Sequence, residues 1–112
     1  MEISVSSYSF QALINAGTIT QEETLLEAQK LGFRYIEFTD LTPCENYSYE
    51  DQVESAKRIR KNADALGIKV NAYTIGANLY QETEEARENE VERIKKQLDI
   101  AKILGAPVLR HD

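Results

Sequence analysis

The sequence predicts an α/β fold in which repeated strand–helix units build one parallel sheet. A Leu-Gly pair occurs at 31–32, 66–67 and 104–105, and each pair joins an amphipathic stretch to a short apolar run. Glycine readily adopts the left-handed conformation that follows a helix C-terminus, so each pair indicates a helix end followed by a strand. The three glycines lie 35 and 38 residues apart, about the length of one strand–helix unit. Three such joints in register predict parallel strands.

The first strand and the first helix are expected before residue 32. Residues 3–6 alternate apolar side chains with serines, which is typical of a strand with one buried face. Residues 8–17 have apolar side chains at helical spacing and end in a glycine, which predicts one or two helical turns. Thr20 and Glu23 have the spacing of a capping box, so the first main helix is expected to open at Thr20. Its inner stripe consists of Leu25, Ala28 and Leu31.

The second unit begins with a strand over residues 34–38, which carries the acid Glu37. After a loop, Ser48 is expected to cap a helix over residues 49–66. The side chains that face inward from this helix are Val53, Ala56, Ile59, Ala63 and Leu66. A third strand is expected over residues 68–74, which are rich in β-favouring side chains.

The third unit contains the longest helix, expected over residues 83–104. Glu92 precedes Lys96 by four residues, a spacing that predicts a surface ion pair. A fourth strand is expected to begin near Val108, just after Gly105 and a proline. The apolar stripe predicted to face inward from the helix consists of Val91, Ile94, Leu98, Ala101 and Leu104.

Two architectures fit this order of elements. An open flavodoxin-like sheet has helices on both faces and usually a fifth strand, whereas a (β/α)8 barrel needs about twice this length. Strands that are buried on both faces are continuously apolar, and polar side chains that point inward suit the mouth of a barrel. We therefore expect residues 1–112 to form a single domain that is half of a TIM barrel, with four strands and three main helices. The polar residues on one face of the expected strands are Ser4, Ser6, Glu37, Asn71, Tyr73 and Arg110.

Composition and charge disfavour two classes of partner. The net charge of −6 opposes nonspecific binding to phosphate backbones, so we expect no nucleic-acid partner. No apolar run approaches the roughly 18 residues of a membrane span, and the N-terminus lacks the features of a secretory signal. The lone cysteine, Cys44, excludes an intrachain disulfide and is compatible with a reducing compartment. We therefore expect a cytoplasmic protein without a membrane partner.

Several phrases resemble the N-terminal half of sugar phosphate isomerase/epimerase proteins, which are xylose isomerase-like TIM barrels. The phrases are SSYSFQALINAG, KLGFRYIEF, NAYTIGANL and DIAKILGAPVLRHD, and together they cover nearly the whole chain. The resemblance implies a divalent metal (Mn²⁺, Mg²⁺ or Zn²⁺) at the mouth of the intact barrel and isomerisation or epimerisation of a small sugar or sugar phosphate. In such proteins the metal ligands come mostly from the second half. For this chain alone we therefore expect no metal site and no activity.

The resemblance also implies which residues form the first-half wall of the pocket. Glu37 and His111 are expected to be catalytic, and Tyr8, Tyr73 and Arg110 are expected to bind substrate. Tyr8 and Tyr73 also fit roles as core or rim aromatics. His111 is the one histidine of the chain and lies at the end of the last expected strand, which suits an acid, a base or a ligand.

Glu37 is the sharpest of these candidates. It lies between Ile36 and Phe38, so its side chain points to the opposite face and enters the barrel if those two pack on helices. Arg110 lies five residues past its glycine, as Glu37 does past Gly32, so both side chains are expected to share one face. Two roles fit this pattern: a structural ion pair inside the barrel, or direct contact with a substrate.

Three functional hypotheses follow from these observations. The first is half of a metal-dependent sugar isomerase or epimerase. The second is a non-catalytic α/β module that binds sugars or assembles with a partner. The third, nucleic-acid repair of the endonuclease IV type, is disfavoured by the acidic charge. The open strand edges and an exposed inner face with Val70, Ala72 or Tyr73 predict a homo-oligomer.

Overall fold

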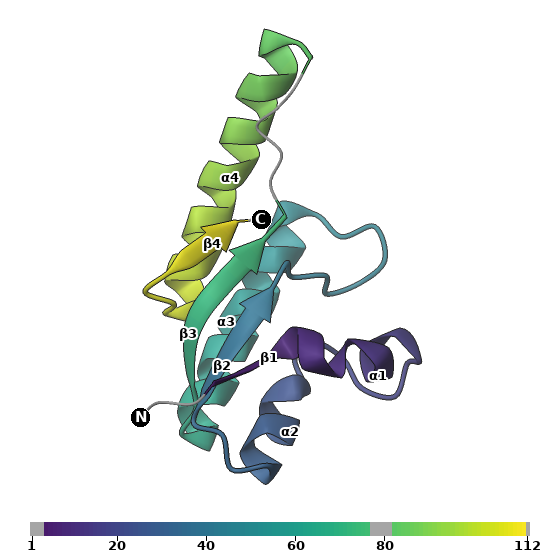
Figure 1. Cartoon of the computed structure of the whole chain (residues 1–112), viewed down its shortest axis with the longest axis vertical. Helices are drawn as coiled ribbons and strands as arrows, with labels where there is room; N and C mark the ends of the chain where they lie inside the picture. Colours follow the sequence, from purple (N-terminus) through teal and green to yellow (C-terminus); the bar gives the residue numbers. More distant parts are fainter. Residues whose placement is uncertain (1–3, 77–81, 112) are drawn as a thin grey trace.

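The computed structural model describes residues 4–76 and 82–111 (Figure 1). In this part of the chain one sheet contains four parallel strands, arranged in the order in which they occur in the sequence. A sheet in sequence order is what consecutive strand–helix units of a barrel produce, and the half-barrel prediction is confirmed. The strands are β1 (Ser4–Ser6), β2 (Tyr35–Thr39), β3 (Lys69–Ile75) and β4 (Leu109–His111).

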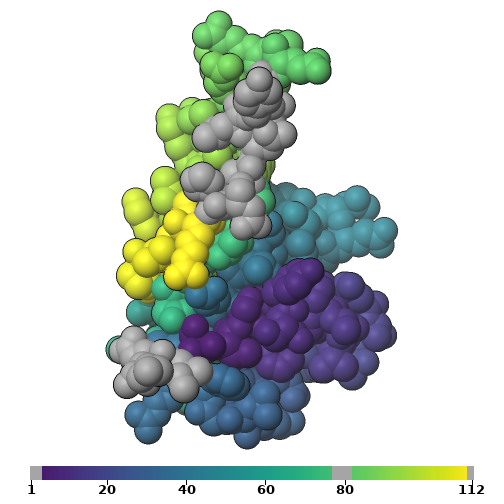
Figure 2. Space-filling model, in the orientation of Figure 1, coloured from purple at the N-terminus to yellow at the C-terminus, as the bar shows by residue number. Residues whose placement is uncertain are grey.

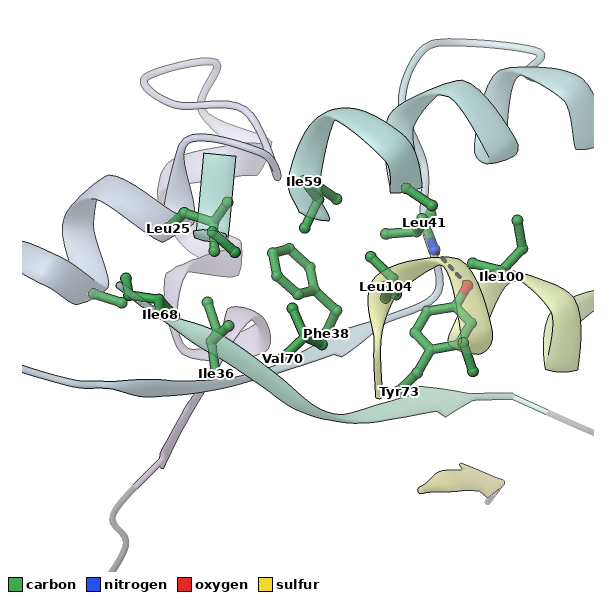
Figure 3. Close-up of a cluster of buried hydrophobic side chains, with 14 of the residues drawn as sticks. Leu25, Ile36, Phe38, Leu41, Ile59, Ile68, Val70, Tyr73, Ile100 and Leu104 are labelled. Atoms are coloured by element: carbon green, nitrogen blue, oxygen red, sulfur yellow. Dashed lines mark hydrogen bonds between the residues drawn. The ribbon is translucent and has the colours of Figure 1, made fainter. Parts of the chain in front are cut away.

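The helices connect successive strands and share one core with the sheet. This core contains side chains from α2, α3 and α4 together with side chains from β2 and β3, so the three helices lie on the same face of the sheet (Figure 3). The first turns of α4 project beyond the sheet at the top of Figures 1 and 2. The helices are η1 (Ser7–Phe10), α1 (Gln11–Asn15), α2 (Thr24–Lys30), α3 (Tyr49–Leu66) and α4 (Glu84–Leu104).

Three joints between a helix and the next strand share one construction. Each joint begins with a buried alanine, continues with two residues that differ between the joints, and ends with the Leu-Gly pair. The three glycines have φ values of 87°, 73° and 79°. The amide after each glycine donates to the carbonyl of that alanine, five residues back, over 2.9–3.0 Å. The bonded pairs are Phe33 with Ala28, Ile68 with Ala63, and Ala106 with Ala101. The predicted helix ends at the Leu-Gly pairs are thus confirmed.

The capping predictions are confirmed, with one shift of a helix start. The Ser48 hydroxyl and the Asp51 carboxylate cap α3 reciprocally. Thr20 and Glu23 also exchange both capping-box bonds, but the α-helix proper begins at Thr24 because residues 21–23 form turns. In the predicted stripe of α2, Leu25 and Ala28 are buried, whereas Leu31 is exposed at the C-cap.

Strand register divides the side chains of the sheet into two faces. Residues that pair in a parallel sheet point to the same side, so each paired row shares a face. The face that carries no helix has a row of Ser6, Glu37 and Ala72, followed by a row of Thr39, Thr74 and Arg110. We call this the inner face. Its polar character on β1, β2 and β4 agrees with the prediction.

The inner-face prediction for β3 was wrong because of a bulge. Ile36 pairs with Val70, but the next residue, Glu37, pairs with Ala72, so Asn71 is an extra residue on β3. An extra residue reverses the alternation of side chains beyond it. Tyr73 therefore points toward the helices and is fully buried, and Val70 is also part of the core. Val70, Ala72 and Tyr73 are all buried, so they do not form the exposed apolar inner face that we expected.

The predicted stripe of α4 is only partly buried. Ala101 and Leu104 lie in the core, together with Ile100 and Gln97, whereas Val91 and Leu98 are 37% and 42% exposed. The Lys96 ammonium lies 5.5 Å from the ring centroid of Tyr49 on α3, which marks the flank of α4 that faces α3. At 3.6 residues per turn, Val91 and Leu98 lie on the opposite flank. Glu92 pairs with Lys95 at 3.2 Å rather than with the predicted Lys96.

Candidate functional site

The carboxyl ends of β2 and β3 lie beside a cavity of about 310 Å³. Ligand sites of parallel α/β folds lie at this end of the strands. The cavity is lined by Tyr8 of η1, Thr39 and Asp40 at the end of β2, and Thr74 and Gly76 at the end of β3. We call this region the mouth. A larger hollow of about 690 Å³ is lined mainly by residues of α2, α3 and the segments beside them, and it shares Ile14, Gln21 and Thr42 with the mouth.

Tyr8 is the most exposed aromatic residue at the mouth, with 68% of its surface accessible. The Ser6 hydroxyl accepts a hydrogen bond of 3.2 Å from the Tyr8 amide and so fixes the start of η1 at the end of β1. The next residue, Ser7, is buried and accepts a bond from the Thr39 amide at 3.3 Å. A substrate-binding role for Tyr8 stays a prediction.

Glu37 and Arg110 form the ion pair that the sequence pattern suggested. Arg110 Nη1 donates to Glu37 Oε1 over 2.9 Å, across β3, where Ala72 provides a small side chain beside Glu37. The side chains of Glu37 and Arg110 are 23% and 58% exposed, so water screens the pair on the open inner face. The guanidinium has further N–H donors that suit an anionic group. Whether either residue acts on a substrate stays a prediction.

Asp40 is a mouth residue that the sequence reasoning missed. Its Oδ2 accepts a hydrogen bond of 3.0 Å from the amide of Gly76, which ties the end of β2 to the end of β3. The signal was available, because Asp40 directly follows a buried strand at the end where ligand sites of such folds occur. Alternation within the strand singles out Glu37 and says nothing about the residue that follows the strand.

Tyr73 occupies a different place from the predicted pocket wall. Its hydroxyl accepts a bond of 3.1 Å from the Leu41 amide (Figure 3). The same hydroxyl donates a bond of 2.7 Å to Gln97 Oε1 on α4. Burial raises the pKa of the phenol, so the hydroxyl stays protonated and can donate at any physiological pH. Tyr73 therefore supports the mouth from behind the sheet and does not line it.

The prediction for His111 falls outside the described side chains. The backbone of His111 pairs with Ile75 at the end of β4, next to Arg110. This position at the carboxyl end of a strand agrees with the sequence expectation for the backbone. A catalytic role for the imidazole stays a prediction.

The described residues do not offer a donor set for a metal ion. Within 4–76 and 82–111, no three His, Cys, Asp or Glu side chains gather in one place. On the inner face, outside the lining of the mouth cavity, Glu37 is bonded to Arg110, and at the mouth Asp40 accepts from the Gly76 amide. Cys44 is exposed, and its Sγ lies 3.9 Å from Asp51 Oδ2. The residues present therefore do not fit the divalent metal that the resemblance implies.

The fold and the mouth together define a barrel-type α/β protein whose polar side chains gather at the carboxyl ends of the strands. The chain belongs to the xylose isomerase-like TIM barrel family, whose profile matches residues 25–112. The resemblance to sugar phosphate isomerase/epimerase proteins is thereby confirmed at the level of the family. A comparison with curated proteins found no match. Among the described residues, no helix is both long and apolar enough to cross a membrane.

Proposed function

We propose that this chain forms the first-half wall of the substrate mouth in a metal-dependent sugar or sugar phosphate isomerase or epimerase. The observation that carries the proposal is the mouth itself, where polar side chains gather beside a cavity at the carboxyl ends of parallel strands. Membership of the xylose isomerase-like family supports sugar chemistry at that place. Tyr8, Glu37 and Arg110 are the side chains proposed to face the substrate, and His111 is proposed to act beside them.

The proposed reaction moves a proton between neighbouring carbons of a sugar in an isomerase, or removes and returns a proton at one carbon in an epimerase. A bound divalent metal would stabilise the negative charge that develops on the sugar oxygens. The described residues do not supply the donors for it, so the proposal places the metal ligands in the part of the barrel that would complete the mouth. Within this chain, Arg110 is suited to hold a phosphate or an oxyanion, and Glu37 is suited to orient the guanidinium through their ion pair.

Two further parts of the proposal concern location and assembly. We infer a cytoplasmic protein, because the exposed free thiol of Cys44 is compatible with a reducing compartment. We also infer a homo-oligomer joined through the sheet edges, because β1 and β4 end the sheet in the described part of the chain.

A second candidate function is a non-catalytic sugar-binding or assembly module. It is favoured by the lack of a metal-binding cluster among the described residues, because a mouth without metal ligands can hold a sugar without converting it. The two candidates differ in whether the bound sugar is converted to an isomer or epimer.

Incubation in D₂O separates these candidates. The chain is incubated with D-fructose and Mg²⁺, and NMR follows sugar binding, deuterium at C1 and C3 of the sugar, and the appearance of an isomeric or epimeric sugar. Binding without exchange or conversion is expected for the chain alone, whereas either change would contradict an incomplete catalytic site. Exchange or conversion that begins when the metal-binding half is supplied supports the enzyme, and bound sugar that is never changed supports the module. No binding in any arm would contradict both candidates for this sugar.

A further inference from the structure

The backbone of residues 39–42, at the rim of the mouth, is held by side chains from four other elements or connections. The Thr39 amide donates to Ser7 Oγ, while Gln21 Nε2 donates to the Thr39 and Asp40 carbonyls at 3.1 and 2.9 Å. Gln21 Oε1 accepts from the Thr42 amide at 3.0 Å. Gln21 is itself 8% exposed, so these bonds form largely away from water. We call residues 39–42 the held turn.

Leu41, inside the held turn, closes a ring of buried hydrogen bonds. Its amide donates to the Tyr73 hydroxyl, which donates to Gln97 Oε1. Gln97 Nε2 then donates to Gln52 Oε1 at 2.9 Å. Gln52 Nε2 donates to the Leu41 carbonyl at 2.9 Å, which closes the ring. The ring thereby joins the turn to β3, α4 and α3. Each donor in it has an acceptor, which is the condition under which buried polar groups stabilise rather than destabilise a fold.

The held turn fixes one charged side chain at the mouth. Asp40 follows β2, and its Oδ2 is anchored by the Gly76 amide at 3.0 Å. A carboxylate has more acceptor sites than one amide uses, so Asp40 can also accept hydrogen bonds from a ligand. The hydroxyl residues Thr39 and Thr74, paired in the sheet, line the same cavity, and exposed Tyr8 lies on its η1 side.

Such a turn is costly to build for stability alone. Two glutamines and a tyrosine hydroxyl occupy the core, where apolar side chains of similar size would pack without the cost of burying polar groups. Gln52, Tyr73 and Gln97 hold the turn from outside the cavity, and Gln21 holds it from the cavity wall. A backbone fixed by supporting side chains is how binding sites preorganise the group that contacts a ligand. The buried polar side chains and the fixed backbone together suggest that Asp40, the one acid in the held turn, contacts a ligand.

We propose that Asp40 is a ligand-binding carboxylate that accepts hydrogen bonds from vicinal hydroxyls of a sugar, and that Gln21, Gln52, Tyr73 and Gln97 are its positioning residues. The inference rests on the proposed function and names a residue for it. A carboxylate, two threonine hydroxyls and an exposed aromatic ring match the chemistry of a polyhydroxylated ligand, which offers donor hydroxyls and an apolar C–H face.

The test is an amide-resolved NMR titration of the chain with D-fructose and, separately, with D-mannitol, its reduced counterpart. Saturable shifts are expected at the amides of Asp40, Thr42 and Gly76 with both sugars, because hydroxyls rather than the carbonyl are recognised. Asp40→Asn is expected to weaken binding by about tenfold or more, since it removes charge-assisted bonds. The matched control is Asp99→Asn on exposed α4, which removes the same charge and is expected to bind like wild type.

The positioning residues are tested by Tyr73→Phe, with Gln97→Leu as the second variant if the first does not fold. A folded variant is expected to bind sugar several-fold more weakly although Asp40 is intact, and to show altered shifts at Leu41 and Thr42 before any sugar is added. Unchanged binding in a folded variant would overturn the positioning role. Either variant is checked for a cooperative melt first, so that loss of fold is not read as loss of binding.

The outcomes separate this inference from the proposed function. If wild type binds sugar and Asp40→Asn binds equally well, the Asp40 assignment is wrong while a sugar-binding mouth remains. If neither sugar gives a saturable shift, Asp40 is not a sugar ligand in this chain. The exchange experiment in D₂O concerns catalysis and does not depend on which carboxylate holds the sugar.

Discussion

The contact between Glu37 and Arg110 follows from strand alternation alone, which places both side chains on one face of the sheet. Each lies five residues past the glycine of its joint, and the structure brings their side chains to 2.9 Å on one face. The pair spans β3, so it depends on strands that are not neighbours in the sheet. The contact could be predicted because both strands are regular up to that point.

The strength of the Glu37–Arg110 pair can be measured with a double-mutant cycle of Glu37→Gln and Arg110→Met. Because Arg110 is 58% exposed, the coupling free energy is expected to stay below about 1 kcal/mol. The matched control is Arg58 with Glu22, of similar exposure (54% and 23%) but with two bonds of 2.9 Å, and a larger coupling is expected there. Urea unfolding of the variants gives both values. A coupling near 3 kcal/mol for Glu37–Arg110 would mean that the pair is shielded from water.

Tyr73 and Asp40 mark where residue-level prediction ended. Nothing in the letters of β3 signals that Asn71 is an extra residue, because a bulge is set by the pairing with β2 and not by local propensity. Tyr73 was therefore assigned to the wrong face. Asp40 could be predicted as a site residue from the rule that ligand sites follow the ends of parallel strands. Its hydrogen bond with the Gly76 amide could not, because the two residues lie 36 positions apart in the sequence.

Among the elements, α3 was predictable to its last residue and α4 was not fully so. Ser48 and Gly67 are local signals, and they bound α3 as expected. The stripe of α4 has the right spacing, yet spacing alone does not say which neighbour a stripe meets. Val91 and Leu98 lie on a flank that no described element covers, so an apolar stripe was read as core.

The cap of α3 makes a prediction about acid stability. The Ser48 amide and hydroxyl bond to Asp51 and lower the pKa of its carboxyl below the ordinary value. A carboxyl with a lowered pKa in the folded state stabilises the protein above its unfolded-state pKa, and this stabilisation is lost as the pH falls through the folded-state pKa. Asp51→Asn should therefore lower the melting temperature at neutral pH, and the difference from wild type should vanish as the pH falls below the lowered pKa of Asp51.

The control for the cap is Glu50→Gln in the same first turn of α3. Glu50 shares the helix dipole with Asp51, but it is Asp51 that completes the capping box. Melting curves followed by circular dichroism should therefore show a smaller effect for Glu50→Gln. An equal effect of both variants would assign the stabilisation to the dipole and not to the bond with Ser48.

At the scale of the whole molecule, the described part of the chain has two sheet edges and a partly exposed apolar flank on α4. β4 ends the sheet in the described part, and the flank of α4 that carries Val91 and Leu98 faces away from α3. A second copy whose β1 pairs in parallel with β4 would extend the sheet with the same parallel pairing that joins neighbouring strands within the chain. The mouth would then gain a second wall.

Leu98→Lys and Leu26→Lys form a matched test of this assembly. The two leucines are 42% and 43% exposed, but Leu26 lines the hollow between α2 and α3, away from the β4 edge. Light scattering after gel filtration at micromolar concentration is expected to give twice the 12.7 kDa chain mass for wild type and for Leu26→Lys. Leu98→Lys is expected to give the chain mass alone. A monomeric wild type would contradict the assembly.

Metal binding is the other property that belongs to the whole molecule. Because the described residues lack a donor cluster, titration calorimetry with Mn²⁺, Mg²⁺ or Zn²⁺ is expected to show only weak binding without a defined stoichiometry. One site per chain with an affinity of about 1 μM would contradict this expectation. A site that forms only in an oligomer would show the concentration dependence of that oligomer.

The repeated joint at Gly32, Gly67 and Gly105 bears on how such a chain can grow. Each joint connects a helix to the next strand with the same glycine conformation and the same hydrogen bond to an alanine carbonyl. A strand–helix segment moved from one joint to another would therefore keep the same angle between the helix and the strand that follows. Tandem duplication of a gene for such a unit would lengthen the sheet by whole modules without new loop chemistry, and the curvature of the array would decide when it closes.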